Sequence, residues 1–266
     1  MITKSYLAAP LAALLLLAAT LAGGIRAEEA PSRQFPLSGF TRVVLEGSSS
    51  LELVQGDGFE VIATGSEEAM PHVKAELRGE SLELSVEPER KFFFGVISVS
   101  DESSVRFRVT LPVVDAVVVT GSGEVRADTL ESENLELRVT GSGTLKVNKV
   151  AAESLSASLT GSGDLLLGTV LAVRGETSIR GSGDMRLDSF AGETLAAKIT
   201  GSGDMVVGGR VGELDISLMG SGDFVGRGLQ AKSAGGSIMG SGDVVLRRPG
   251  RDSFSVMGSG DVALVE

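Results

Sequence analysis

The sequence predicts an all-β protein, a solenoid built from stacked coils of about 20 residues. Three observations predict it. The tripeptide Gly-Ser-Gly recurs eight times at nearly constant intervals, apolar residues alternate with polar ones on both sides of each copy, and helical periodicity is nearly absent beyond the N-terminus. A fixed period of this length is typical of solenoids, in which each repeat forms one coil.

The spacing of the tripeptide defines the coil. The intervals between successive copies are 20, 20, 20, 20, 19, 20 and 18 residues. The copies start at Gly121, Gly141, Gly161, Gly181, Gly201, Gly220, Gly240 and Gly258.

The flanks of each tripeptide are predicted strands, because their apolar residues recur with a period of two. Leu135, Leu137 and Val139 precede one copy, and Leu145 and Val147 follow it. After these two strands, each coil has one more apolar residue at a matching position, which we call its third contact. This residue suggests a third short side to the coil, although a two-sided coil fits as well. The third contacts are Leu130, Val150, Val170 and Phe190.

The tripeptides are predicted corners between strands. Glycine reaches positive φ without steric cost, and stacked corners leave little room for side chains between neighbouring backbones. Strands would then pair in parallel from coil to coil, about 4.8 Å apart. Equivalent residues would stack in columns, and with no Trp and one Tyr the shared core must be mainly aliphatic.

Four segments are expected along the chain. Residues 1–27 form a signal peptide, with Lys4 at the start, an apolar run over residues 7–22 and Ala27 at the cleavage site. An uncleaved membrane anchor is the alternative, but the run is short for a bilayer span. Residues 28–37 are a predicted linker, residues 38–110 irregular coils that cap the solenoid, and residues 111–266 the regular repeat.

The balance of charges excludes some partners. The chain has 24 basic and 35 acidic residues, a net charge of −11, and the segment 1–27 contributes two basic residues and no acidic ones. A strongly negative surface repels phosphate backbones, so nucleic-acid binding is not expected.

The absence of cysteine excludes disulfides and thiolate chemistry. No second segment is apolar enough to cross a membrane, so the mature chain is expected to have no transmembrane segment.

An acidic column is the main candidate site. An aspartate follows each of the last six corners, and stacking would place these carboxylates about 5 Å apart, where like charges repel. Two arrangements would relieve the repulsion: cations such as Ca²⁺ could bridge the carboxylates, or each carboxylate could turn to solvent and accept N–H groups of the turn. The column comprises Asp164, Asp184, Asp204, Asp223, Asp243 and Asp261.

Two further surface features are notable. The position before each corner is Thr in early coils and Met219, Met239 and Met257 in late ones, which suggests either a simple surface strip or a docking surface near the C-terminal end. The aromatic run Phe92–Phe94, after Arg90 and Lys91, either packs as a cap over the solenoid end or inserts into a partner.

Several segments resemble one bacterial family. They are Gly39-Phe40, the segment from Leu51 to Gly56, Leu111-Pro112, and the later coils of Val-Thr-Gly-Ser-Gly-Asp type. The family is described as putative auto-transporter adhesin, head GIN domain, and the resemblance spans residues 38–264. It implies a right-handed parallel β-helix in a bacterial cell envelope and brings no catalytic residues with it.

The sequence therefore predicts an exported, non-enzymatic binding module, periplasmic or on the cell surface, whose partner would be a surface glycan or an envelope protein. No coil carries an insertion that could wall an active-site cleft, and no catalytic motif with a histidine partner occurs. No cofactor is expected, apart from Ca²⁺ if the aspartates bind cations. A structural protein is the alternative, because the final strand, Val262–Val265, leaves an open edge through which copies could self-associate. A polysaccharide-acting enzyme is the third possibility.

Overall fold

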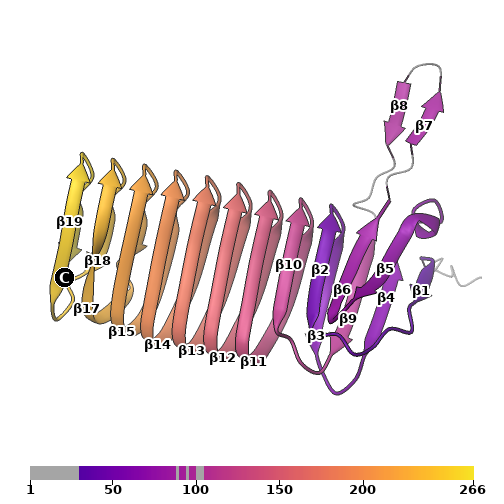
Figure 1. The fold of residues 1–266 in the computed structure, drawn as a ribbon, viewed down its shortest axis with the longest axis horizontal. Helices are drawn as coiled ribbons and strands as arrows, with labels where there is room; N and C mark the ends of the chain where they lie inside the picture. Colours follow the sequence, from indigo (N-terminus) through magenta and orange to yellow (C-terminus); the bar gives the residue numbers. More distant parts are fainter. Residues whose placement is uncertain (1–29, 88–89, 94–95, 100–104) are drawn as a thin grey trace, which may run out of the picture.

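The structure is a computed structural model that describes residues 30–87, 90–93, 96–99 and 105–266. In Figure 1 the strands stand side by side along the long axis of the molecule, with the C-terminal coils at one end. The described residues contain no α-helix, and the short 3-10 turn η1 (Met70–His72) is their one helical element. Within them, no helix has the length and apolar character that a bilayer crossing requires.

The regular repeat forms the predicted parallel solenoid. Most residues of a coil pair with their equivalents in the next coil, so Gly121 pairs with Gly141 and Gly141 with Gly161. The register shifts between Leu187 and Phe190, where the next coil is one residue shorter. The predicted fold class is confirmed. The strands are β10 (Ala116–Gly121), β11 (Glu124–Gly141), β12 (Thr144–Gly161), β13 (Asp164–Gly181), β14 (Asp184–Gly201), β15 (Met205–Gly220), β16 (Phe224–Gly226), β17 (Leu229–Gly240), β18 (Val244–Arg247), β19 (Asp252–Gly258) and β20 (Val262–Val265).

Both glycines of a corner are required, for different reasons. Gly121 has φ +113°, and a Cβ atom on it would lie 2.5 Å from the carbonyl oxygen of Gly47. Gly143 has no such φ, but its Cβ would lie 2.5 Å from the carbonyl oxygen of Gly123. The serine between them donates its backbone N–H to the first glycine of the coil before, as in Ser142 N to Gly121 O at 2.9 Å. At both glycine positions of the Gly-Ser-Gly corners there is therefore no room for a side chain.

The core is one continuous column of mainly aliphatic side chains, with a few buried phenylalanines such as Phe190. Leu145, Leu165 and Met185 are stacked equivalents with at most 1% exposure, and the third contacts Leu130, Val150, Val170 and Phe190 are buried as well. Thr177 is a buried polar exception, and its hydroxyl donates to the carbonyl oxygen of Ala196 at 3.1 Å. The coils are therefore held together by apolar packing and backbone hydrogen bonds.

The N-terminal part continues the stack and then closes it. β2 (Arg42–Gly47) and β3 (Ser50–Gln55) pair in parallel with β10 and β11. β6 (Ser81–Val86) and β9 (Arg106–Leu111) add one further parallel layer. Gly47 lies under Gly121 and has φ +92°, so Gly47-Ser48-Ser49 is the first corner of the stack.

Antiparallel strands end the stack on this side. β5 (Val73–Arg78) pairs antiparallel with β6, and β4 (Glu60–Thr64) with β9. β1 (Ser32–Gln34) pairs antiparallel with β4, and Phe35 is buried behind it. Within the predicted linker, residues 28–37, residues 32–34 form this strand of the cap. Residues 28 and 29, like the predicted signal peptide 1–27, lie outside the described residues.

A separate hairpin interrupts the cap. β7 (Arg90–Phe93) pairs antiparallel with β8 (Val96–Val99) and forms a sheet of its own, which stands away from the stack in Figure 1. The predicted aromatic run begins on β7. Its last residue, Phe94, and the contacts of its side chains lie outside the described part of the chain.

Candidate binding groove and aspartate column

The aspartates form a column beside the corners, as predicted. Asp164 and Asp184 are register partners, and each aspartate occupies the position just after its Gly-Ser-Gly corner. Their side chains are exposed or half-buried. The column is therefore an outer edge of the solenoid.

In the later coils these carboxylates bind backbone. Asp204 Oδ1 accepts the backbone N–H of Asp223 at 2.8 Å, and Asp223 and Asp243 in turn accept the N–H of the next aspartate, also at 2.8 Å. Asp184 does the same at 3.2 Å to Asp204. Each carboxylate thus bonds to the coil that follows it.

In the early coils the N–H group of the residue after each corner donates to a backbone carbonyl oxygen and not to a carboxylate. The N–H groups of Thr144, Asp164 and Asp184 donate to the second corner glycine of the preceding coil, at 3.0 to 3.1 Å. The change to carboxylate acceptors falls between Asp184 and Asp204. Among the described residues, no group of three or more acidic or histidine side chains is arranged to hold a metal ion. Cation binding by the column stays a prediction.

A surface groove with several charged side chains opens where two strands part. β3 and β11 pair from Ser50 with Glu124 to Leu53 with Ala127, after which β3 continues along β9 while β11 leaves it. The space between them is about 740 Å³. We call it the β3–β11 groove, and its outward polar lining includes Glu52, Gln55, Arg126, Asp128, Lys146 and Asn148.

Hydrogen bonds hold the walls of the β3–β11 groove in place. Gln55 bridges its two sides, since its amide nitrogen donates to Glu131 O at 2.8 Å and its amide oxygen accepts Glu131 N–H at 2.7 Å. Asn148 donates to Asp128 Oδ1 at 2.9 Å, and Thr129 donates to the other carboxylate oxygen at 3.3 Å. The hydrogen bond from Asn148 is the main cause that lowers the pKa of Asp128 from its ordinary value. The lining is therefore preorganised.

Charges in the β3–β11 groove are balanced, unlike those of the whole chain. Its lining contains three acidic residues and three basic ones: Glu52, Glu124, Asp128, Arg106, Arg126 and Lys146. Arg126 forms an ion pair with Glu124 at 2.6 Å, and Arg108 beside the groove pairs with Glu52 at 3.1 Å. Such a lining offers donors and acceptors to a neutral polar ligand and has no net charge that would select a charged one.

Sequence reasoning did not find this groove. Glu52 and Asp128 lie 76 positions apart in the chain and meet only because the cap stacks on the first regular coil. The available signal was the run of charged residues at outward positions of successive coils, such as Arg126 and Lys146, which pair in register. Without the pairing of β3 with β11, this run is indistinguishable from a solvated face.

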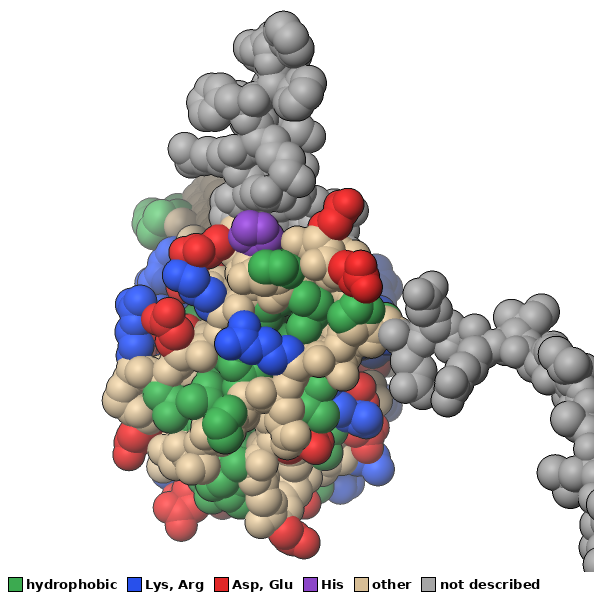
Figure 2. Space-filling view, turned by 90° about the vertical axis from the view of Figure 1, so that its right-hand side faces the viewer, with side chains coloured by type: hydrophobic (Ala, Val, Ile, Leu, Met, Phe, Trp, Pro, Cys, Tyr) green, Lys and Arg blue, Asp and Glu red, His purple; other side chains and the backbone are tan. Residues whose placement is uncertain are grey.

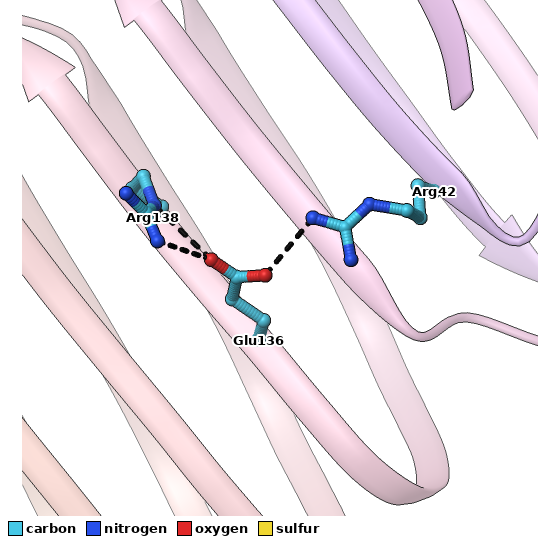
Figure 3. Close-up of polar contacts among 3 residues, drawn as sticks. All are labelled: Arg42, Glu136 and Arg138. Atoms are coloured by element: carbon cyan, nitrogen blue, oxygen red, sulfur yellow. Dashed lines mark hydrogen bonds and ion pairs between the residues drawn. The ribbon is translucent and has the colours of Figure 1, made fainter. Parts of the chain in front are cut away.

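An ion-pair cluster lies on another face of the same coils (Figure 3). Glu136 accepts hydrogen bonds from Arg42 Nη2 at 2.9 Å and from Arg138 Nη2 at 2.5 Å. Partial burial acts to raise the pKa of Glu136, but the hydrogen bonds from Arg138 and Arg42 outweigh it and the pKa lies below its ordinary value. Arg42 on β2 reaches Glu136 on β11 across Ala116 of the intervening β10, so the cluster ties the cap to the repeat.

Stacked parallel coils, an antiparallel cap and a polar surface groove define a capped β-solenoid of repeat type. The family model described as "Putative auto-transporter adhesin, head GIN domain" matches residues 39–174 and 168–265. The chain belongs to this family. No curated protein matches the chain.

Solved structures share the fold. A putative adhesin from Parabacteroides merdae has a TM-score of 0.77 at 18% identity, and one from Bacteroides fragilis has 0.67 at 17%. A protein from Parabacteroides distasonis described as a putative lipid binding protein has 0.64 at 18%. In all three comparisons the match covers 90% of this chain and 98% of the other. At these identities the likeness is one of fold.

Proposed function

We propose that this protein is an exported, non-catalytic, adhesin-like module of the bacterial cell envelope that binds a neutral, hydroxyl-rich ligand, a surface glycan, in the β3–β11 groove. The observation that carries the proposal is a preorganised groove of balanced charge on a chain of net charge −11. Membership of an adhesin-like family and the apolar run over residues 7–22 support export to the envelope.

The lining of the groove suits hydroxyl groups. A sugar hydroxyl both donates and accepts, and the groove offers carboxylate, amide, ammonium and guanidinium groups close together. Lys146 and Arg106 have no ion pair within the described residues, so both can donate to a ligand. Because Gln55 and Asn148 are already held by hydrogen bonds, little side-chain entropy is lost when a ligand binds.

The same lining disfavours a lipid tail. Acyl chains require an enclosed, mainly apolar cavity, whereas the β3–β11 groove is open at the surface and has six charged side chains in its lining. The lipid in the description of the Parabacteroides distasonis protein is therefore not the ligand proposed here.

The contacts of two groove carboxylates, Asp128 and Glu124, favour binding without cleavage. Glycoside hydrolysis needs a carboxylic acid that keeps its proton near neutral pH. In the groove, Asp128 has a lowered pKa because Asn148 hydrogen-bonds to it, and Glu124 is paired with Arg126. These carboxylates are set up to accept hydrogen bonds.

A glycan array tests the proposal. The purified protein is expected to retain a subset of neutral surface glycans, and Lys146→Ala and Asn148→Ala are each expected to weaken that binding about tenfold, the loss of roughly one charged or neutral hydrogen bond. Arg186→Ala is the matched control, because Arg186 occupies the column of Lys146 two coils further on, outside the groove. Retention of no glycan, or equal losses in all three variants, contradicts the proposal.

A further inference from the structure

Exposed methionines form a strip along one face of the later coils. The residue before each of the last three corners is a methionine, and the register pairs Met219 with Met239 and Met239 with Met257. Their side chains are 46%, 36% and 64% exposed. Met219 and Met239 each have a coil on both sides, so they belong to the side face of the solenoid. We call the three residues the methionine strip.

Packing of the core does not explain the methionine strip. Thr140 occupies the same position in an earlier coil, and Thr200 is the register partner of Met219, so this position accepts a polar residue. An exposed side chain also gains little from the hydrophobic effect. Met185 and Met205 differ, because they are core residues with 1% and 0% exposure. The thioether groups of the strip therefore face solvent without a packing role.

The column beside the methionine strip is uncharged. Two positions before the three methionines, on the same side of the strands, lie Ser217, Ser237 and Ser255. In earlier coils the same column contains Arg138 and Lys198. Charge is common elsewhere on the surface, and Figure 2 shows basic and acidic side chains around small apolar areas at the N-terminal end. The coils that carry the strip thus place no basic side chain in the column next to it.

We propose that the methionine strip is a binding site for a soft monovalent metal ion, copper(I), held by three thioether sulfur atoms. Thioethers are soft ligands that select Cu(I), whereas carboxylates and carbonyls suit hard cations such as Ca²⁺. The chain has no cysteine and one histidine, so methionine sulfur is the main soft donor that it offers. The site lies on other coils than the β3–β11 groove and does not depend on glycan binding.

The register brings three sulfur atoms within reach of one ion. Neighbouring strands lie about 4.8 Å apart, and metal–sulfur bonds are about 2.3 Å long. For an ion over Met239, the sulfur atoms of Met219 and Met257 must each lean toward it by about 2.5 Å, the difference between these lengths. Methionine is unbranched and has three rotatable bonds, so a change of rotamer supplies this shift. The net charge of −11 also favours a cation over an anion.

Competition with bicinchoninate, a chromogenic Cu(I) chelator, tests the site under oxygen-free, reducing conditions. The purified protein is expected to withdraw about one Cu(I) ion per chain, because the three thioethers share one ion. Met239→Leu removes the central sulfur at nearly constant side-chain volume and should weaken binding at least about tenfold. Met185→Leu is the matched control and should leave binding unchanged, because Met185 is buried and its column already contains Leu145 and Leu165.

Nuclear magnetic resonance of methyl-labelled methionines identifies the ligands. Addition of Ag(I), a redox-inert analogue of Cu(I), should shift the methyl signals of Met219, Met239 and Met257 together and leave those of Met185 and Met205 in place. Three results overturn the site: no uptake of Cu(I) from the chelator, equal binding by the unmodified protein and Met239→Leu, and methyl signals of the strip that do not move. Equal weakening by Met239→Leu and Met185→Leu contradicts it as well.

Discussion

At the scale of single residues, backbone proximity determines the repeat. Corner glycines of neighbouring coils stack so closely in space that a Cβ atom on either would collide with a carbonyl oxygen of the preceding coil, as at Gly121 and Gly143. The aspartates after the later corners also serve the backbone. Each accepts a hydrogen bond from the N–H group of the next aspartate, which has no backbone carbonyl as its acceptor within the described chain. The most repeated residues of the sequence are therefore explained by backbone stacking before any ligand is considered.

Replacing a corner glycine should be costly. Gly161→Ala places a Cβ against the carbonyl oxygen of Gly141 at a φ of +120°, so the expected loss in the free energy of unfolding is about 2–4 kcal/mol. Urea denaturation followed by circular dichroism measures it. Gly58→Ala is the control, because a Cβ there meets nothing within 4 Å and φ is ordinary. Similar midpoints for the two variants would show that the corners do not stack this tightly.

The aspartates should differ in importance along the column. Asp223→Ala leaves the N–H of Asp243 without its acceptor and is expected to cost about 1 kcal/mol, with part of the loss restored in Asp223→Asn. Asp164→Ala should cost less, since the N–H of Asp184 donates to Gly163 O instead. Thermal melting of the three variants, with and without Ca²⁺, compares the capping role with the predicted cation ladder. A Ca²⁺-dependent rise in melting temperature that Asp223→Ala removes would favour the ladder.

At the scale of elements, the sequence predicts which residues form strands better than it predicts which strands pair with each other. Alternation around Leu135 to Val139 predicts which residues face the core. The nearly constant period aligns the coils, so most of the register of β10 to β20 follows from the repeat, apart from the shift between Leu187 and Phe190. The cap has no period. The antiparallel pairing of β4 with β9 and of β1 with β4 depends on packing between distant segments, and the β3–β11 groove depends on it too.

The ion-pair cluster should stabilise the junction of cap and repeat. Glu136→Gln removes the charge that holds Arg42 and Arg138, and the expected loss is about 1 kcal/mol near neutral pH. Glu153→Gln is the matched control, since its pair with Arg174 is exposed at 61% on both sides. Urea denaturation of both variants measures the difference.

The cluster also predicts a pH dependence. The pKa of Glu136 is lowered in the folded protein, so its contribution is complete above the ordinary value of 4.5 and is lost as pH falls through the lower folded value. The difference in stability between the unmodified protein and Glu136→Gln should therefore be largest near neutral pH and should shrink as the pH falls below the ordinary pKa of a glutamate. A difference that is independent of pH would show that Glu136 acts without its charge.

At the scale of the whole molecule, the solenoid is a rigid support with a groove near its capped end. The groove lies where the cap meets the first regular coil, and the regular coils extend from there along the long axis of the molecule. The repeat predicts the support, but the groove becomes visible only once the strands are paired.

Distances between corners test the stacking of the coils most directly. The chain has no cysteine, so pairs of spin labels can be attached to cysteines introduced at Ser122, Ser202 and Ser259, which are exposed corner residues. Pulsed electron resonance should give about 19 Å for Ser122 to Ser202 and about 34 Å for Ser122 to Ser259, since each coil adds about 4.8 Å. Distances that do not grow in proportion to the number of coils between the labels would contradict the stack.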